Sequence, residues 1–158
     1  MARLTFDGNW RVFVVDTVVD IAAPTVAEIG AGTEITSFIP KNGLAVSNAP
    51  NMVDTGDLST QYDSEVMGTY KVNASLTILL DDTTDTASDE FQTHGSASHL
   101  VILPYKGTGD VAAADVVHVL PMETGKAVPN GTAANERQTA DVPIAVTDEP
   151  SFYGAVAA

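Results

Sequence analysis

The stretch DTGDLSTQYDSEVMGTYKVNASLTILL, which runs from Asp54 to Leu80, decides the fold. Its second half alternates between apolar and polar residues. The apolar positions are Tyr70, Val72, Ala74, Leu76, Ile78 and Leu80, and the polar positions are Lys71, Asn73, Ser75 and Thr77. Successive side chains of a strand point to opposite faces, so this pattern predicts a β-strand with one face buried and one face in solvent.

The first half of the stretch is acidic and polar and contains Gly56 and Gly68. It follows SNAPNM (residues 47–52), which also has the composition of a loop. We therefore expect a long interaction loop over about residues 47–68, because long loops on rigid strands often carry binding sites. Tyr62, Val66 and Met67 are unusual in such a loop, and they pack either on this chain's own core or on another subunit.

Composition limits the possible functions. The chain has 158 residues, which fits a single domain over residues 1–158. It has 7 basic and 21 acidic residues and a formal charge of −14, so it is not expected to hold nucleic acid by its phosphates. It lacks cysteine, which excludes disulfides and thiol catalysis. Its N-terminal residues lack the apolar segment of a signal peptide, and we expect no membrane insertion by this chain.

The remaining segments predict further strands. Strands are expected at 11–15, 34–39, 44–46, 99–105, 115–122, 136–147 and 152–157, and one short helix at 86–94. In the segment 136–147, apolar Ala140 and Val142 alternate with Thr139 and Asp141, while Pro143 indicates an edge or a bulge. The predicted fold class is mainly β, an antiparallel β-sandwich or barrel with one short flanking α-helix.

Catalytic and metal-binding patterns are weak. None of the three histidines has a sequence neighbourhood that supplies a nucleophile and an orienting group. The acidic cluster Asp81, Asp82, Asp85, Asp89 and Glu90 lacks the spacing and the glycine of a calcium loop. We expect no catalytic residue, no metal, no cofactor and no enzymatic activity.

The chain resembles the major tail tube proteins of long-tailed, non-contractile bacteriophages. The resemblance rests on APTVAEIGAGTEIT (residues 23–36), on VDTGDLSTQYDSEVMGTY (residues 53–70) and on the alternating strand that follows. The short helix before HLVILPY and the late strand ending in VPIAVTDEP follow in the same order.

The resemblance implies hexameric rings that stack into a tube around a tape-measure protein and later conduct DNA through an acidic lumen. It also implies contacts with the tail terminator and tail tip proteins, a place in the virion, and synthesis in the cytoplasm of the host bacterium. The expected inter-subunit loop residues are Asp54, Thr55, Gly56, Asp57, Tyr62, Val66 and Met67. The expected lumen-facing residues are Asn73, Ser75, Thr77, Thr139 and Asp141. Lys71 and Arg137 are expected to make pairs between subunits instead. The alternative interpretation is a monomeric β-sandwich binding module, such as a phage decoration or adhesion protein.

Overall fold

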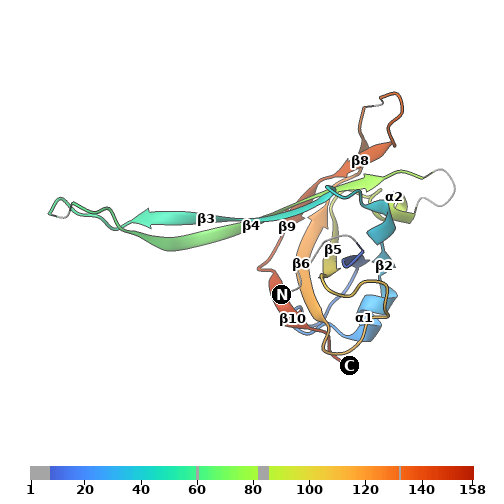
Figure 1. Ribbon diagram of the computed structural model, residues 1–158, viewed down its shortest axis with the longest axis horizontal. Helices are drawn as coiled ribbons and strands as arrows, with labels where there is room; N and C mark the ends of the chain where they lie inside the picture. The colour runs from blue at the N-terminus through green and yellow to red at the C-terminus, as the bar shows by residue number, and fades with distance from the viewer. Residues whose placement is uncertain (1–7, 60, 82–85, 132) are drawn as a thin grey trace.

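The computed structural model describes residues 8–59, 61–81, 86–131 and 133–158, and its strands form two antiparallel sheets (Figure 1). One sheet has the order β10-β6-β5-β1-β2, with β9 also paired to β6, and the other has the order β3-β4-β8-β7. The strands are β1 Arg11–Val15, β2 Thr33–Glu34, β3 Leu44–Asp54, β4 Glu65–Leu79, β5 Ser96–Leu103, β6 Val116–Thr124, β7 Val128–Pro129, β8 Thr139–Val142, β9 Ile144–Val146 and β10 Ser151–Ala155. The helices are α1 Val26–Ala31, the 3-10 turn η1 Thr36–Phe38 and α2 Thr86–Glu90. The predicted mainly β fold class is confirmed.

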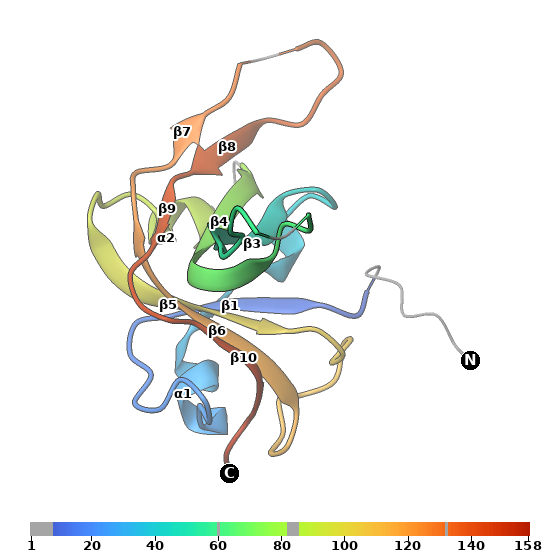
Figure 2. The same ribbon diagram turned by 90° about the vertical axis from the view of Figure 1, so that its left-hand side faces the viewer.

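The body of the molecule has three layers (Figure 2). One core cluster lies between the sheets, where Val14 and Leu120 of the larger sheet pack with Leu76 and Ile78 of the smaller sheet. A second cluster covers the other face of the larger sheet and includes Ile29 of α1. The four-stranded sheet and α1 therefore form the two outer layers.

The alternation of buried and exposed residues that was predicted for the strand now labelled β4 is confirmed between Lys71 and Ile78. Val72, Leu76 and Ile78 are buried, whereas Asn73 and Ser75 are exposed. The predicted segment 136–147 is two strands rather than one. The chain passes at Pro143 from β8 in the smaller sheet to β9 in the larger sheet, since proline cannot donate to a continuing ladder.

Several predicted boundaries were wrong. The segment 34–39 forms mainly η1 rather than a strand, and α2 is shorter than the predicted helix at 86–94. A further helix, α1, forms because Thr25 caps it: its side chain accepts from the backbone N–H of Glu28, and the Glu28 carboxylate accepts from the backbone N–H of Thr25. The described chain thus has two short α-helices instead of one.

Candidate assembly surfaces

The most exposed part of the molecule is a long hairpin formed by β3 and β4. The two strands pair from Leu44 opposite Leu76 to Asp54 opposite Glu65. Every described residue from 45 to 71 is exposed. We call residues 47–70 the arm, and Figure 1 shows that it projects far from the body.

The interaction loop expected over 47–68 is mostly strand. Only residues 55–64 connect the two strands, because β3 extends to Asp54 and β4 begins at Glu65. The segment contains Pro50 and Gly68, residues that are rare in strands, so its composition indicated a loop. Its strand structure comes from pairing between its two halves, a pairing that neither half reveals alone.

A β-bulge sets which side chains share a face of the arm. Pro50 pairs with Tyr70 but Met52 pairs with Met67, so β4 has one more residue than β3 at this point. Strict alternation from Tyr70 would place Gly68 and Val66 on the face that continues the core. The extra residue brings Met67 to that face instead, opposite Met52. Gly68 fits here because an added Cβ would lie only 3.1 Å from the carbonyl oxygen of Asn51.

The predicted inter-subunit residues all lie in the outer part of the arm and are exposed. Met67 is 73% exposed and Tyr62 is 80% exposed, so neither packs on this chain's own core. The arm also presents Leu58, which is fully exposed at its tip and is not among the residues predicted for contact. Apolar groups that the protomer leaves in water are candidates for contact with another subunit.

Side-chain hydrogen bonds order the tip of the arm. The carboxylate of Asp54 accepts from the N–H of Gly56 at 2.7 Å, and that of Asp57 accepts from the N–H of Ser59 at 2.7 Å. The N–H of Thr55 donates to the carbonyl of Ser64 at 2.8 Å across the turn. Two of the predicted contact carboxylates therefore also shape the turn.

The base of the arm is held against the body. The hydroxyl of Tyr70 donates to the carboxylate of Glu149, in the connection between β9 and β10. This hydrogen bond raises the pKa of Tyr70. Next to it, Tyr70, Val72 and residues 146–150 line a small cavity of about 290 Å³. The contact joins the start of the arm to the connection between β9 and β10.

The predicted lumen-facing residues lie together on the outer face of the four-stranded sheet. Thr77 pairs with Asp141 in the ladder, and its hydroxyl donates to the Asp141 carboxylate at 2.8 Å. Asn73 and Ser75 continue the same face along β4 toward the arm, and Thr139 lies beside Asp141 on β8. The sheet therefore presents short hydroxyl, amide and carboxylate groups to solvent.

The four-stranded sheet ends in the edge strands β3 and β7. Among the described residues, β3 pairs only with β4, and β7 pairs only with β8. Unpaired strand edges present backbone N–H and C=O groups that are able to bind another strand. An eleven-residue edge strand such as β3 is long for a protein that remains a monomer.

Within the described residues we find no group of three or more His, Asp or Glu side chains able to hold a metal ion. Asp82 and Asp85 of the acidic cluster lie outside the described residues. Asp89 and Glu90 accept hydrogen bonds from Gln92 and Thr33. No helix in the described ranges is long and apolar enough to cross a membrane.

His118 is held in place by its contacts with β10. The Nδ1 atom of His118 accepts from the backbone N–H of Tyr153 at 2.9 Å, and its ring packs edge-on against Phe152 and Tyr153. Burial lowers the pKa of His118, which favours the neutral ring that this hydrogen bond requires. His118 therefore has a structural role in holding β10.

Comparisons with known proteins agree with the geometry. No curated protein sequence matches the chain. A chain from the virion of a native gene transfer agent particle has a TM-score of 0.54 at 14% identity, over 96% of this chain and 98% of that chain. A chain from the 6-fold symmetrised baseplate of the anti-feeding prophage has a TM-score of 0.57 at 10% identity, over 98% of each chain. The model of the phage tail tube protein family matches residues 1–158. The chain therefore belongs to the phage tail tube protein family and is a structural protein of the tail.

Proposed function

We propose that this chain acts without enzymatic activity by self-assembling into hexameric rings that stack into a tube. The observation that carries the proposal is the four-stranded sheet, which is buried on one face and polar on the other, and whose two edge strands have no further partner in the part of the chain that the structure describes. A structural neighbour belongs to a 6-fold symmetrised assembly, which supports six copies per ring.

The two free edges make a ring chemically reasonable. Strand β3 of one copy pairs with β7 of the next, so the four-stranded sheets join into one continuous barrel. This is a head-to-tail contact between different surfaces, and such contacts close into rings when the rotation between copies allows it. Ring closure also removes both exposed edges.

In this arrangement the polar face lines the lumen. Asn73, Ser75, Thr77, Thr139 and Asp141 would face the interior, and α1 in the opposite layer would face outward. Asp141 repeats around each ring, and the chain has an overall charge of −14. The resulting negative potential repels phosphate groups, so that DNA passes without binding.

The arm contacts neighbouring copies through Tyr62, Val66 and Met67. Lys71 and Arg137 make ion pairs between copies. The tube encloses a tape-measure protein and ends at the tail terminator and tail tip proteins. The chain is synthesised in the cytoplasm of the host bacterium and is then incorporated into the virion.

Electron microscopy of the purified chain at increasing concentration tests assembly, with rings or tubes as the expected result. Because the chain has no cysteine, Ser75→Cys introduces a single thiol, whose reactivity shows whether position 75 faces the lumen. Within a tube, this thiol should react with a small maleimide but not with a bulky polymer-linked one. Val19→Cys is the control, since Val19 is 88% exposed in the segment before α1 and should react with both. A chain that stays monomeric at every concentration would contradict the proposed assembly. Reaction of the bulky maleimide with Ser75→Cys in assembled tubes would contradict the assignment of this face to the lumen.

A further inference from the structure

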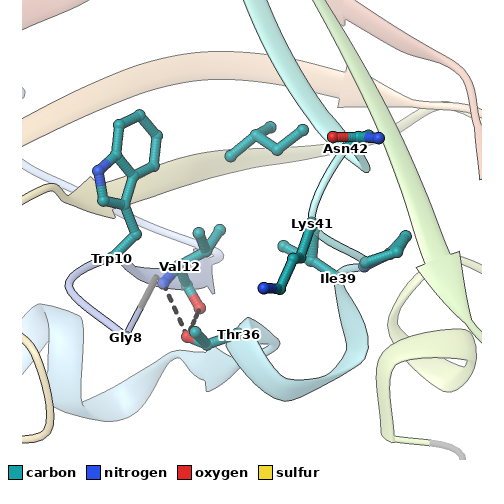
Figure 3. A pocket seen from close by; sticks show the side chains of 9 residues that line it. Gly8, Trp10, Val12, Thr36, Ile39, Lys41 and Asn42 are labelled. Carbon is teal, nitrogen blue, oxygen red and sulfur yellow. Dashed lines mark hydrogen bonds between the residues drawn. The ribbon is translucent and has the colours of Figure 1, made fainter. Parts of the chain in front are cut away.

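An open groove lies at the end of the body where β3 begins (Figure 3). It has a volume of about 720 Å³ and is lined mainly by apolar side chains. Trp10 forms one side, and Ile39 and Lys41 lie on the other side. The floor is fixed by Thr36, whose hydroxyl oxygen accepts from the N–H of Val12 at 2.9 Å. We call this the Trp10 groove.

We propose that the Trp10 groove receives the tip of the arm, residues 57–59 and 61–62, from a second copy of this chain in the adjacent ring. The proposal rests on the assembly proposed above and names the receiving surface for the arm. The position of the two surfaces, their apolar character and their charge support it.

Position excludes the chain's own arm from the groove. Leu44 lines the groove at the start of β3, while the tip lies beyond Asp54 at the other end of the same strand. At about 3.3 Å per residue, these ends are roughly 33 Å apart. If copies stack by translation along β3, the tip of one copy meets the groove end of the next. Such a contact joins two different surfaces and repeats without limit along a stack.

The two surfaces also complement each other chemically. The tip presents Leu58, fully exposed, and Tyr62, 80% exposed, which would bury apolar area against Trp10 and Ile39. Between Leu44 and Tyr70 the chain has acidic Asp54, Asp57, Asp63 and Glu65 but no lysine or arginine. Of the described residues that line the groove, Lys41 is the charged one. The acidic outer part of the arm and the lysine beside the groove have opposite charges, which favours this contact between copies that each carry a net charge of −14.

Cysteine cross-linking tests the contact. Copies carrying Leu58→Cys are mixed with copies carrying Asn42→Cys at the groove, assembled and oxidised. We expect a disulfide between the two kinds of copy that forms only on assembly. Leu58→Cys mixed with Val19→Cys is the matched control and should not cross-link. Tubes that form normally without the Leu58–Asn42 cross-link would overturn this inference and leave the proposed function intact, whereas failure of the unmodified chain to assemble would overturn both.

A charge exchange tests the role of Lys41. Lys41→Glu should raise the concentration needed for tube formation by on the order of tenfold, because it opposes like charges. Adding Asp63→Lys, which leaves the hydrogen bond of the Asp57 carboxylate in place, should restore part of the assembly, and a failure of this rescue would contradict the proposed pairing. A disulfide within single copies of a Phe6→Cys/Asn42→Cys variant in assembled tubes would show that the chain's own first residues fill the groove, which would also overturn the inference.

Discussion

The body and the arm share the strands β3 and β4 and differ in what covers them. In the body, β4 lies against the larger sheet, and Leu76 is only 2% exposed. In the arm no second layer from the described residues covers the same strand, and Met67 is 73% exposed although it lies on the face that continues the core. The comparison shows that an apolar face can continue past the edge of a domain, where it becomes available to another subunit.

Removing the arm should have the largest effect on function. In a variant that replaces residues 49–71 with Asn-Gly, Asn48 and Val72 flank a two-residue turn of the type that joins paired strands. We expect the body to fold with a free energy of unfolding within about 1 kcal/mol of the parent, because the removed residues are exposed. Tube formation by electron microscopy should be lost. Tubes of normal appearance would show that the arm is dispensable for assembly.

Truncating the core should have the largest effect on stability. Leu76→Ala removes a side chain that is buried between the two sheets, and we expect the free energy of unfolding in urea to fall by about 2–5 kcal/mol. The matched variant Met67→Ala, on the same strand in the arm, should change it by less than about 0.5 kcal/mol. Equal losses at the two positions would mean that the arm packs on its own body in solution.

The N-cap of α1 should contribute to the stability of the layer opposite the four-stranded sheet. Thr25→Ala removes the side-chain oxygen that accepts from Glu28 N–H at 3.2 Å, and the expected loss is about 1 kcal/mol. Thr25→Ser keeps the hydroxyl and should retain most of the stability in the same urea titration. Asp57→Ala removes an equivalent local hydrogen bond in the arm, and its effect on global unfolding should be undetectable because that turn is exposed.

Sequence periodicity predicted the parts of the fold in which one strand has one buried face. The alternation from Lys71 to Ile78 identified both the core face and the polar face that also carries Asp141. The arm was mistaken for a loop because its strands are exposed on both faces and leave no burial pattern. The bulge at Gly68 was also beyond prediction, since it depends on the register between β3 and β4. The Trp10 groove joins residues from β1, the turn before β3 and η1, which are brought together only by the fold.

The smallest expected effect is a pH dependence confined to the body. Burial lowers the pKa of His118, so the folded state favours the neutral ring and the unfolded state binds more protons below about pH 6.5. The free energy of unfolding should therefore decrease slightly as the pH falls through 6.5 toward the folded-state pKa, where protonation removes the acceptor for Tyr153 N–H. Tyr153 has a φ of 58°, an uncommon conformation for a bulky residue, and this hydrogen bond helps to hold it.

Thermal unfolding between pH 5 and about 7.5, a range above the ordinary carboxylate pKa values, should show this decrease in stability in the parent and in the exposed control His94→Gln. His118→Gln keeps a hydrogen-bond acceptor that does not titrate in this pH range, so this variant should not show the decrease. If its stability depends on pH as strongly as that of the parent, the effect belongs to another group.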